Sequence, residues 1–222
     1  MDELSKYLIN APYYDIDKLE NILNKKIIIT PDHVKCIKQC SVINIFKKYG
    51  YVFTEDDYIY LILNRNNTLL FIPDNEMTNE LCVIAVEQRS YDLRFIPKNK
   101  ITDEICKIAV QKNGKALKYV PEDKKTDEIC KMAVQQNVFA LNFISKKTNE
   151  IYEMAVQQTG IALRYVPEDK KTNEICKIAV QQYGNALNYV PKDKKTIEIC
   201  RIAVSQNIDS LQFVPKDIYD AM

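Results

Sequence analysis

The sequence predicts an all-α solenoid of stacked short helix pairs, and three observations point to this fold class. Similar blocks recur along the chain, each block begins with the apolar spacing of an amphipathic helix, and a charged loop closes it. The blocks open at Thr78, Thr102, Thr126, Thr148, Thr172 and Thr196, with spacings of 24, 24, 22, 24 and 24 residues. A unit of this length cannot bury its apolar side alone, so consecutive units are expected to stack.

The block pattern also sets the predicted domains. Thr54 opens a further block that keeps Leu69 and Phe71 in register, whereas the pattern has almost vanished in residues 30–53. We therefore predict a solenoid of about seven 24-residue repeats over residues 54–222 and an N-terminal helical cap, with a degenerate repeat, over residues 1–53. Within the cap we expect helices at residues 2–11 and 16–24, separated by Pro12-Tyr13-Tyr14.

The first segment of each block, counted from its threonine as position 1, is expected to be an α-helix. Thr102 is a good N-cap, and the acidic residues after it complement the helix dipole. Positions 4, 5, 7, 8 and 9 are apolar and positions 3, 6 and 10 are polar, which is helical spacing. Glycine at position 13, as in Gly114, Gly160 and Gly184, is expected to end the helix in a left-handed conformation.

The second segment, residues 116–120 in the Thr102 block, is expected to be a helix of one or two turns. Its apolar residues at positions 15, 16, 18 and 19 fit an α-helix or a 3-10 helix. An extended conformation is the alternative, although the segment lacks period-2 alternation. Position 8 is Ala and position 16 is Leu in all six blocks from Thr78, and position 18 is Tyr or Phe. We expect Ala to allow close helix approach, with Leu and the ring filling the space between layers.

Composition and charge exclude several classes of function. With 31 basic against 30 acidic residues and a net charge of +1, the chain has no bias toward nucleic acid. Four scattered glycines leave no phosphate-binding loop, and the single histidine leaves little for imidazole chemistry. The sequence has no apolar run of membrane-spanning length and no secretory signal, and it has an odd number of cysteines. We expect an intracellular protein without membrane contact, catalytic activity, cofactor or metal.

The cysteines and the histidine are expected to be structural. Position 5 is cysteine in five blocks, at Cys82, Cys106, Cys130, Cys176 and Cys200. Stacked helices lie about 8–10 Å apart, too far for disulfides, so these thiols are expected to be buried core residues. His33, Cys36 and Cys40 share one face of a predicted helix, but a fourth zinc ligand and an oxyanion-binding device are missing from the pattern.

Lysine pairs at the ends of four blocks form an alternative candidate site. They are Lys124, Lys125, Lys146, Lys147, Lys170, Lys171, Lys194 and Lys195. In a solenoid they would line one edge and could bind nucleic acid or phosphate. Acidic neighbours such as Glu122 and Asp123 offset most of the charge, which favours a solvated loop. The face of Glu104, Lys107 and Gln111 is likewise expected to be solvated, with Glu and Lys supporting the helix from three residues apart.

The main candidate site is the turn at positions 12 to 14, where the blocks differ while the frame stays fixed. Large apolar residues in these turns are plausible recognition anchors for a partner protein, and local packing against the next turn is the alternative. The candidates are Tyr91, Val138, Phe139, Ile161 and Tyr183. The sequence thus favours a scaffold for protein–protein interaction. The last block ends at Tyr219 without a polar capping repeat, so a homodimer through that end is a further hypothesis.

The block beginning TDEICKIAVQKNGKALKYVPEDKK at Thr102 resembles an uncharacterised repeat of giant DNA viruses of the mimivirus group, closely over residues 78–219 and loosely over 54–77. This resemblance implies a viral protein in the cytoplasm of an infected cell, with packaging in the virion as an alternative, and brings no catalytic residues. Residues 45–51, followed by Thr54, are also similar to ankyrin-type units of those viruses. The 24-residue period is similar to that of the leucine-rich variant repeat, an α/3-10 solenoid, which bears on the fold alone.

Overall fold

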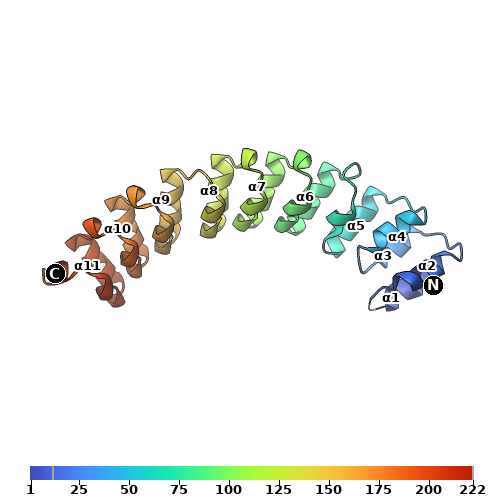
Figure 1. The fold of residues 1–222 in the computed structure, drawn as a ribbon, viewed down its shortest axis with the longest axis horizontal. Helices are drawn as coiled ribbons and strands as arrows, with labels where there is room; N and C mark the ends of the chain where they lie inside the picture. The colour runs from blue at the N-terminus through green and yellow to red at the C-terminus, as the bar shows by residue number, and fades with distance from the viewer. Residues whose placement is uncertain (12, 222) are drawn as a thin grey trace. The chain divides into compact units, whose positions relative to one another are not determined.

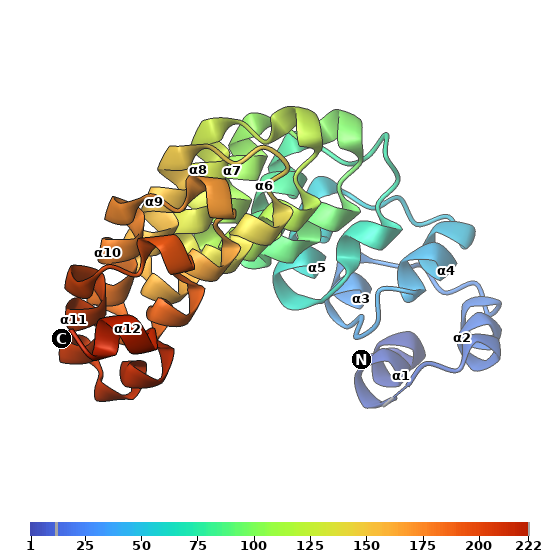
Figure 2. The same cartoon turned by 60° about the vertical axis from the view of Figure 1, so that its left-hand side comes forward.

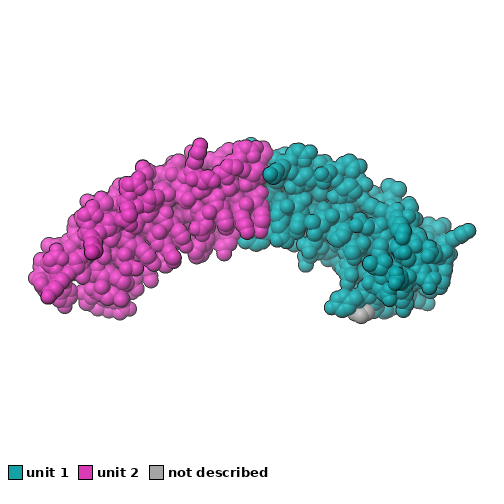
Figure 3. All heavy atoms as spheres, in the orientation of Figure 1, with its two compact units in different colours: residues 1–109 teal, residues 110–222 magenta. Residues whose placement is uncertain are grey.

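The computed structural model describes residues 1–11 and 13–221. It divides into two compact units, residues 1–109 and 110–222 (Figure 3). This division falls inside a repeat, so the predicted boundary at residue 53 stays a prediction. Pro12, predicted to separate the first two helices, and Met222 lie outside the described residues.

Unit 1 contains the N-terminal helices and the first repeats (Figure 1). Its elements are α1 (Glu3–Asn10), α2 (Ile16–Leu23), α3 (Pro31–Lys35), α4 (Val42–Lys48), α5 (Glu55–Asn64), η1 (Thr68–Phe71), α6 (Asn79–Gln88), η2 (Ser90–Phe95) and η3 (Lys98–Lys100), where η denotes a 3-10 helix. The next helix, α7 (Asp103–Lys112), spans the boundary between the units. The two cap helices predicted from the sequence are α1 and α2.

Unit 2 contains four further α-helices of the repeat, each followed by a 3-10 helix, and a short final helix. Its elements are η4 (Gly114–Tyr119), η5 (Glu122–Lys124), α8 (Asp127–Gln136), η6 (Val138–Phe143), α9 (Asn149–Gln158), η7 (Gly160–Tyr165), η8 (Glu168–Lys170), α10 (Asn173–Gln182), η9 (Gly184–Tyr189), η10 (Lys192–Lys194), α11 (Ile197–Gln206), η11 (Ile208–Phe213) and α12 (Lys216–Tyr219). Helices α8 to α11 pack side by side in chain order (Figures 1 and 2).

These elements confirm the predicted all-α solenoid. The second segment of each repeat from Thr78 onward is a 3-10 helix, which decides between the conformations left open by the sequence. No strand occurs in residues 1–11 and 13–221, so the extended alternative is wrong. The 3-10 segments span positions 13–18, and an extended residue at position 12 separates each from its α-helix, as at Asn137 with φ −157°.

Threonine begins the α-helices as predicted. The hydroxyl of Thr126 accepts a hydrogen bond from the N–H of Ile129 at 3.3 Å, and Thr172 caps the N–H of Ile175 at 3.2 Å in the same way. One of the N–H groups left unpaired at each helix start is thereby satisfied. Positions 4, 5, 8 and 16 point into the core: Ile129, Cys130, Ala133 and Leu141 are buried in the Thr126 repeat. The core therefore lies between the α-helix and the 3-10 helix of successive layers.

The position-13 glycines do not end their helices in a left-handed conformation, contrary to the prediction. Gly114, Gly160 and Gly184 each begin a 3-10 helix, and Gly50 is the glycine with positive φ in the described residues. A Cβ on Gly160 would overlap the carbonyl oxygen of Ala179 in the next repeat, and Gly114 is related to Ala133 in the same way. Glycine is needed here for close approach between layers.

The N-terminal cap keeps the 24-residue spacing of the repeats, although its sequence shows little of the repeat pattern. Lys26, with φ 62°, follows α2 and Gly50, with φ 85°, follows α4. An extended segment follows each left-handed residue and leads to the capping threonines Thr30 and Thr54. Thr30 and Thr54 each belong to a capping box. In the first box the side chain of His33 accepts a hydrogen bond from the backbone N–H of the threonine, and in the second the side chain of Asp57 does so. Residues 26–33 and 50–57 are therefore structurally equivalent although their sequences differ.

Candidate functional site

The predicted anchors lie on the rim, by which we mean positions 12 to 14 of the repeats. In unit 1 the rim includes Tyr91. In unit 2 it includes Val138, Phe139, Ile161 and Tyr183. Phe139 is 49% exposed, and Tyr91, Ile161 and Tyr183 are between 37% and 38% exposed, whereas Val138 is only partly accessible. Large apolar side chains therefore reach solvent at the rim in both units.

The local backbone explains why these side chains point outward. Position 12 is extended, and in three repeats of unit 2 its asparagine side chain caps the following 3-10 helix. The Asn113, Asn137 and Asn207 side chains accept hydrogen bonds from the N–H groups of Lys115, Phe139 and Asp209, each at 3.0 Å. Position 14 is the second residue of a 3-10 helix whose neighbours at positions 15 and 16 are buried in every repeat from Thr78 to Thr172. The position-14 side chain is thereby held on the outer side.

Cations and rings alternate across the unit 2 rim and the adjacent 3-10 helices. Lys115 Nζ lies 5.4 Å from the centroid of the Phe139 ring, and that ring meets Tyr165 edge-to-face with centroids 6.5 Å apart. The Arg164 guanidinium lies 5.3 Å from the Tyr165 ring and 6.0 Å from the Tyr189 ring. Contacts of this kind hold the rings at fixed angles and keep positive charge beside them.

Arg164 and the position-18 rings were missed by sequence reasoning. The rings were expected to fill the space between layers, but Tyr165 and Tyr189 are only half-buried. Position 17 varies as the rim does, with Lys118, Asn142, Arg164, Asn188 and Gln212 in unit 2. Sequence reasoning could have found position 17 by the criterion used for the rim, which selects positions that vary between repeats while the other positions stay constant.

The second lysine of three pairs is engaged within the repeat array. The ammonium of Lys125 donates to the carbonyl of Phe143 at 2.8 Å, Lys171 to that of Tyr189 at 2.8 Å, and Lys195 to that of Phe213 at 2.9 Å. Each acceptor is the last residue of the next 3-10 helix, whose terminal carbonyls lack helical partners. Lys171 is only 6% exposed and also pairs with Glu168 at 2.7 Å. Burial lowers the pKa of Lys195.

The remaining lysines of the predicted basic edge differ in their surroundings. Lys170 and Lys194 lie 3.9 Å from the carboxylates of Asp169 and Asp193. Lys147 donates to the carbonyl of Ile144 in its own repeat at 2.8 Å, Lys146 is exposed, and Lys124 is half-buried. The pairs thus do not present two equivalent cations each, although their binding role stays untested.

The repeat at 126–147 is joined to the next by the shortened loop at Ser145. The 3-10 helices η4 and η6 pack together, and so do η7, η9 and η11 in order, whereas residues 110–221 show no comparable packing of η6 on η7. Position 13 of this repeat is Val138, where three other repeats have glycine. The ammonium of Lys147 donates to a carbonyl of its own repeat. A small groove of about 280 Å³ beside Ser145 and Cys130 accompanies the deletion.

The thiols occupy the places predicted for them. Cys82, Cys106, Cys130, Cys176 and Cys200 are all buried, which confirms the prediction of small core residues. Burial raises the pKa of the Cys176 thiol to about 11, and it raises the pKa of Cys82, Cys130 and Cys200 as well. A thiol held in the neutral form is a poor nucleophile and a poor metal ligand.

His33, Cys36 and Cys40 do not converge on one point of the cap. The His33 Nδ1 atom is 2.8 Å from the Thr30 hydroxyl, and its Nε2 atom is 3.1 Å from the Asp2 carboxylate. The Cys40 thiol instead contacts the Thr68 hydroxyl at 3.4 Å. Within residues 1–11 and 13–221, no group of three or more His, Cys, Asp or Glu could hold a metal ion.

The predicted solvated face of Glu and Lys is bridged between repeats. Lys131 pairs with Glu150 at 2.7 Å and Lys177 with Glu198 at 2.6 Å, so each lysine reaches a glutamate of the next α-helix. In the last repeat, Val204 and Leu211 are half-exposed, whereas their equivalents Val180 and Leu187 are buried. Self-association through this end stays a prediction.

Comparison with known proteins identifies one family. A family model described as a domain of unknown function, DUF4116, matches residues 102–149, 148–193 and 174–219. Neither the curated proteins nor the solved structures gave a match to the chain. No helix of the described part of the chain has the length and apolar character needed to cross a membrane.

Proposed function

Because the chain belongs to the family defined by the domain of unknown function DUF4116, and because its repeats keep one frame while their rims vary, we propose that it is a non-catalytic scaffold that binds another protein through the rim. The observation that carries this proposal is the exposure of Tyr91, Phe139, Ile161 and Tyr183 at equivalent turns of an otherwise uniform array. Folding alone does not require large apolar groups at these places, since Lys115 and Asn185 occupy position 14 in other repeats.

Aromatic side chains are effective anchors because they bury much apolar area at a small cost in conformational entropy. The Phe139 ring is already fixed by Lys115 and Tyr165, so little further ordering would accompany binding. Partner recognition would then depend on which residues each repeat carries at positions 12, 14 and 17.

The alternative function, nucleic-acid or phosphate binding at the lysine edge, has less support. Lys125, Lys171 and Lys195 are bonded to carbonyl groups and would have to give up those bonds to reach a phosphate. The absence of catalysis is likewise part of the proposal, supported by neutral buried thiols and by a histidine engaged in helix capping. The resemblance to giant-virus repeats supports a role in the cytoplasm of an infected cell.

The test is affinity purification with the tagged full chain followed by mass spectrometry. The bait with Tyr91→Ala, Phe139→Ala and Tyr183→Ala is expected to lose a partner that the unchanged chain retains. A matched bait carries Asn79→Ala, Asp127→Ala and Asn173→Ala, three exposed polar changes at the first residues of α6, α8 and α10 in the same repeats, and is expected to retain it. A partner retained by the rim variant, with both variants folded by circular dichroism, contradicts the proposal.

A further inference from the structure

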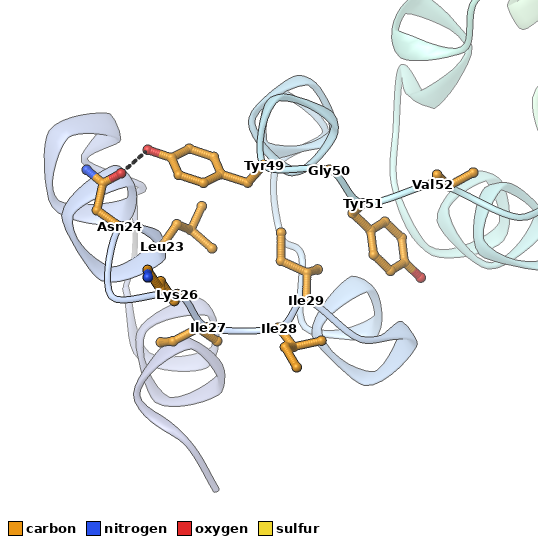
Figure 4. Close-up of a pocket in the computed structure, with 10 residues that line it drawn as sticks. All are labelled: Leu23, Asn24, Lys26, Ile27, Ile28, Ile29, Tyr49, Gly50, Tyr51 and Val52. Carbon is orange, nitrogen blue, oxygen red and sulfur yellow. Dashed lines mark hydrogen bonds between the residues drawn. The ribbon is translucent and has the colours of Figure 1, made fainter.

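A cleft of about 540 Å³ opens in unit 1, away from the rim residues of that unit. Figure 4 shows Ile27, Ile28 and Ile29 along one side, Tyr49 to Val52 along the other, and Leu23 with Asn24 at one end. The Tyr49 hydroxyl donates to the Asn24 side-chain oxygen at 3.0 Å, which fixes that end.

The two sides of the cleft include residues 27–29 and 51–52, which belong to the equivalent extended segments of the cap. β-Branched and aromatic residues favour this conformation. In each segment exposure alternates: Ile28 and Val52 are both 83% exposed, while Phe53 is buried and Ile27 and Ile29 are half-buried. Two large aliphatic side chains, those of Ile28 and Val52, are thus exposed to solvent at the edges of the cleft.

The backbone along the isoleucine side has unused hydrogen-bonding groups. Within residues 1–11 and 13–221, the N–H and C=O groups of Ile27, Ile28 and Ile29 bond to no other protein group, and the same holds for those of Val52. A row of free peptide groups in an extended chain is the feature that pairs with another extended chain. A helix or a lipid chain could not use it.

One cation faces this site without a carboxylate. Lys25 pairs with Glu3 and Lys48 with Glu20, each at 2.8 Å. Lys26, which lines the cleft, has no ion pair among the described residues. Positive charge is therefore left over at this end of the cleft.

We propose that the cleft binds an extended, alternating apolar segment of a partner polypeptide that carries a carboxylate opposite Lys26. The segment pairs its backbone with Ile27–Ile29 and places apolar side chains between Ile28 and Val52. This site is distinct from the rim and does not depend on rim binding.

The test uses a fluorescein-labelled peptide of sequence Thr-Val-Thr-Val-Glu, titrated with the full chain and followed by fluorescence anisotropy. We expect saturable binding, weakened about tenfold when alternate peptide amides are N-methylated, because paired donors are lost. On the protein side, Ile28→Pro and Val52→Ser are each expected to weaken binding about tenfold, since one removes a donor and the other an apolar contact. Lys26→Ala is expected to weaken it about threefold.

One control separates this proposal from rim binding, and one further measurement tests the backbone pairing directly. Tyr91→Ala and Phe139→Ala are expected to leave peptide binding unchanged, and hydrogen exchange should show the amides of Ile27–Ile29 slowed by the peptide. Equal affinity for the N-methylated peptide, no saturable binding, or fast exchange of those amides in the complex overturns the proposal. So does a dimer of the unliganded chain that Ile28→Ser dissociates, because a second copy would then be the occupant.

Discussion

Gly160 lies against the carbonyl oxygen of Ala179, the residue at position 8 of the next repeat, so closely that no Cβ fits between them. Gly184 and Ala203 repeat this relationship, where a Cβ would sit 2.5 Å from the oxygen. The glycine at position 13 and the buried alanine at position 8 are thus two halves of one contact between layers. This contact brings each 3-10 helix onto the α-helix that follows it.

Gly160→Ala is therefore expected to destabilise the chain by about 1–3 kcal/mol, because the added methyl group forces the two layers apart. The measurement is the urea midpoint followed by circular dichroism. Asn188→Ala, an exposed residue of η9 in the next repeat, is the control and is expected to change the stability by less than about 0.5 kcal/mol. Equal midpoints for the two variants would show that the layers are not in contact here.

The ammonium of Lys171 is expected to contribute to stability, whereas that of its neighbour is not. Lys171→Met keeps the aliphatic stem but leaves the Tyr189 carbonyl and Glu168 without their partner. We expect a loss of about 1–3 kcal/mol. Lys170→Met removes an exposed charge and should cost less than about 0.5 kcal/mol. If both substitutions have the same small effect in urea unfolding, the lysine does not bridge the repeats.

The thiols are expected to differ sharply in reactivity. Cys36 is half-buried, whereas the other six cysteines are buried. At neutral pH, a disulfide reagent that releases a coloured thiolate should modify Cys36 in the folded chain and the remaining thiols only after unfolding. Cys36→Ser should abolish the reaction of the folded chain. Rapid modification of a position-5 cysteine without denaturant would contradict the burial that raises the pKa of Cys176 to about 11.

Stability is expected to fall in acid partly through Asp2. The N–H of Ser5, and then His33, hold the pKa of this carboxyl below its ordinary value. Because the folded pKa is lower than the unfolded one of about 3.9, the contribution is full above that value and is lost as the pH falls below it. Asp2→Asn should therefore flatten the decline of the urea midpoint between neutral pH and about pH 3. Asp17→Asn, on the exposed side of α2, should leave the decline unchanged, and equal slopes for both variants would refute the assignment.

Much of the fold was predictable because it follows from local periodicity. The threonine N-caps, the apolar α-helix face and the buried position-5 cysteines depend on spacing within one repeat, as Thr126 and Cys130 illustrate. The glycine prediction failed because the choice of glycine depends on a neighbour: Gly114 avoids an oxygen of Ala133, 19 residues later in the chain. Rules that use only the local sequence predict glycine where the backbone needs a positive φ, and they do not predict a close contact with a distant residue.

The candidate site was predictable in part for the same reason. Variation in a fixed frame located Phe139 and Ile161, whose exposure then follows from the 3-10 helix. The bond from Lys171 to Tyr189 spans 18 residues and could not be foreseen without the layer geometry. The cleft of the cap depends on two unlike segments occupying equivalent places, which sequence similarity did not reveal.

The stacking of repeats is tested most directly by enlarging Ala133, which is fully buried beside Gly114. Ala133→Phe is expected to lower the free energy of unfolding by at least about 3 kcal/mol, since the layers leave no room for a ring. Met132→Phe, at the half-exposed neighbouring position on α8, should have a much smaller effect. A thermal unfolding midpoint for Ala133→Phe equal to that of the unchanged chain would contradict the stacked arrangement.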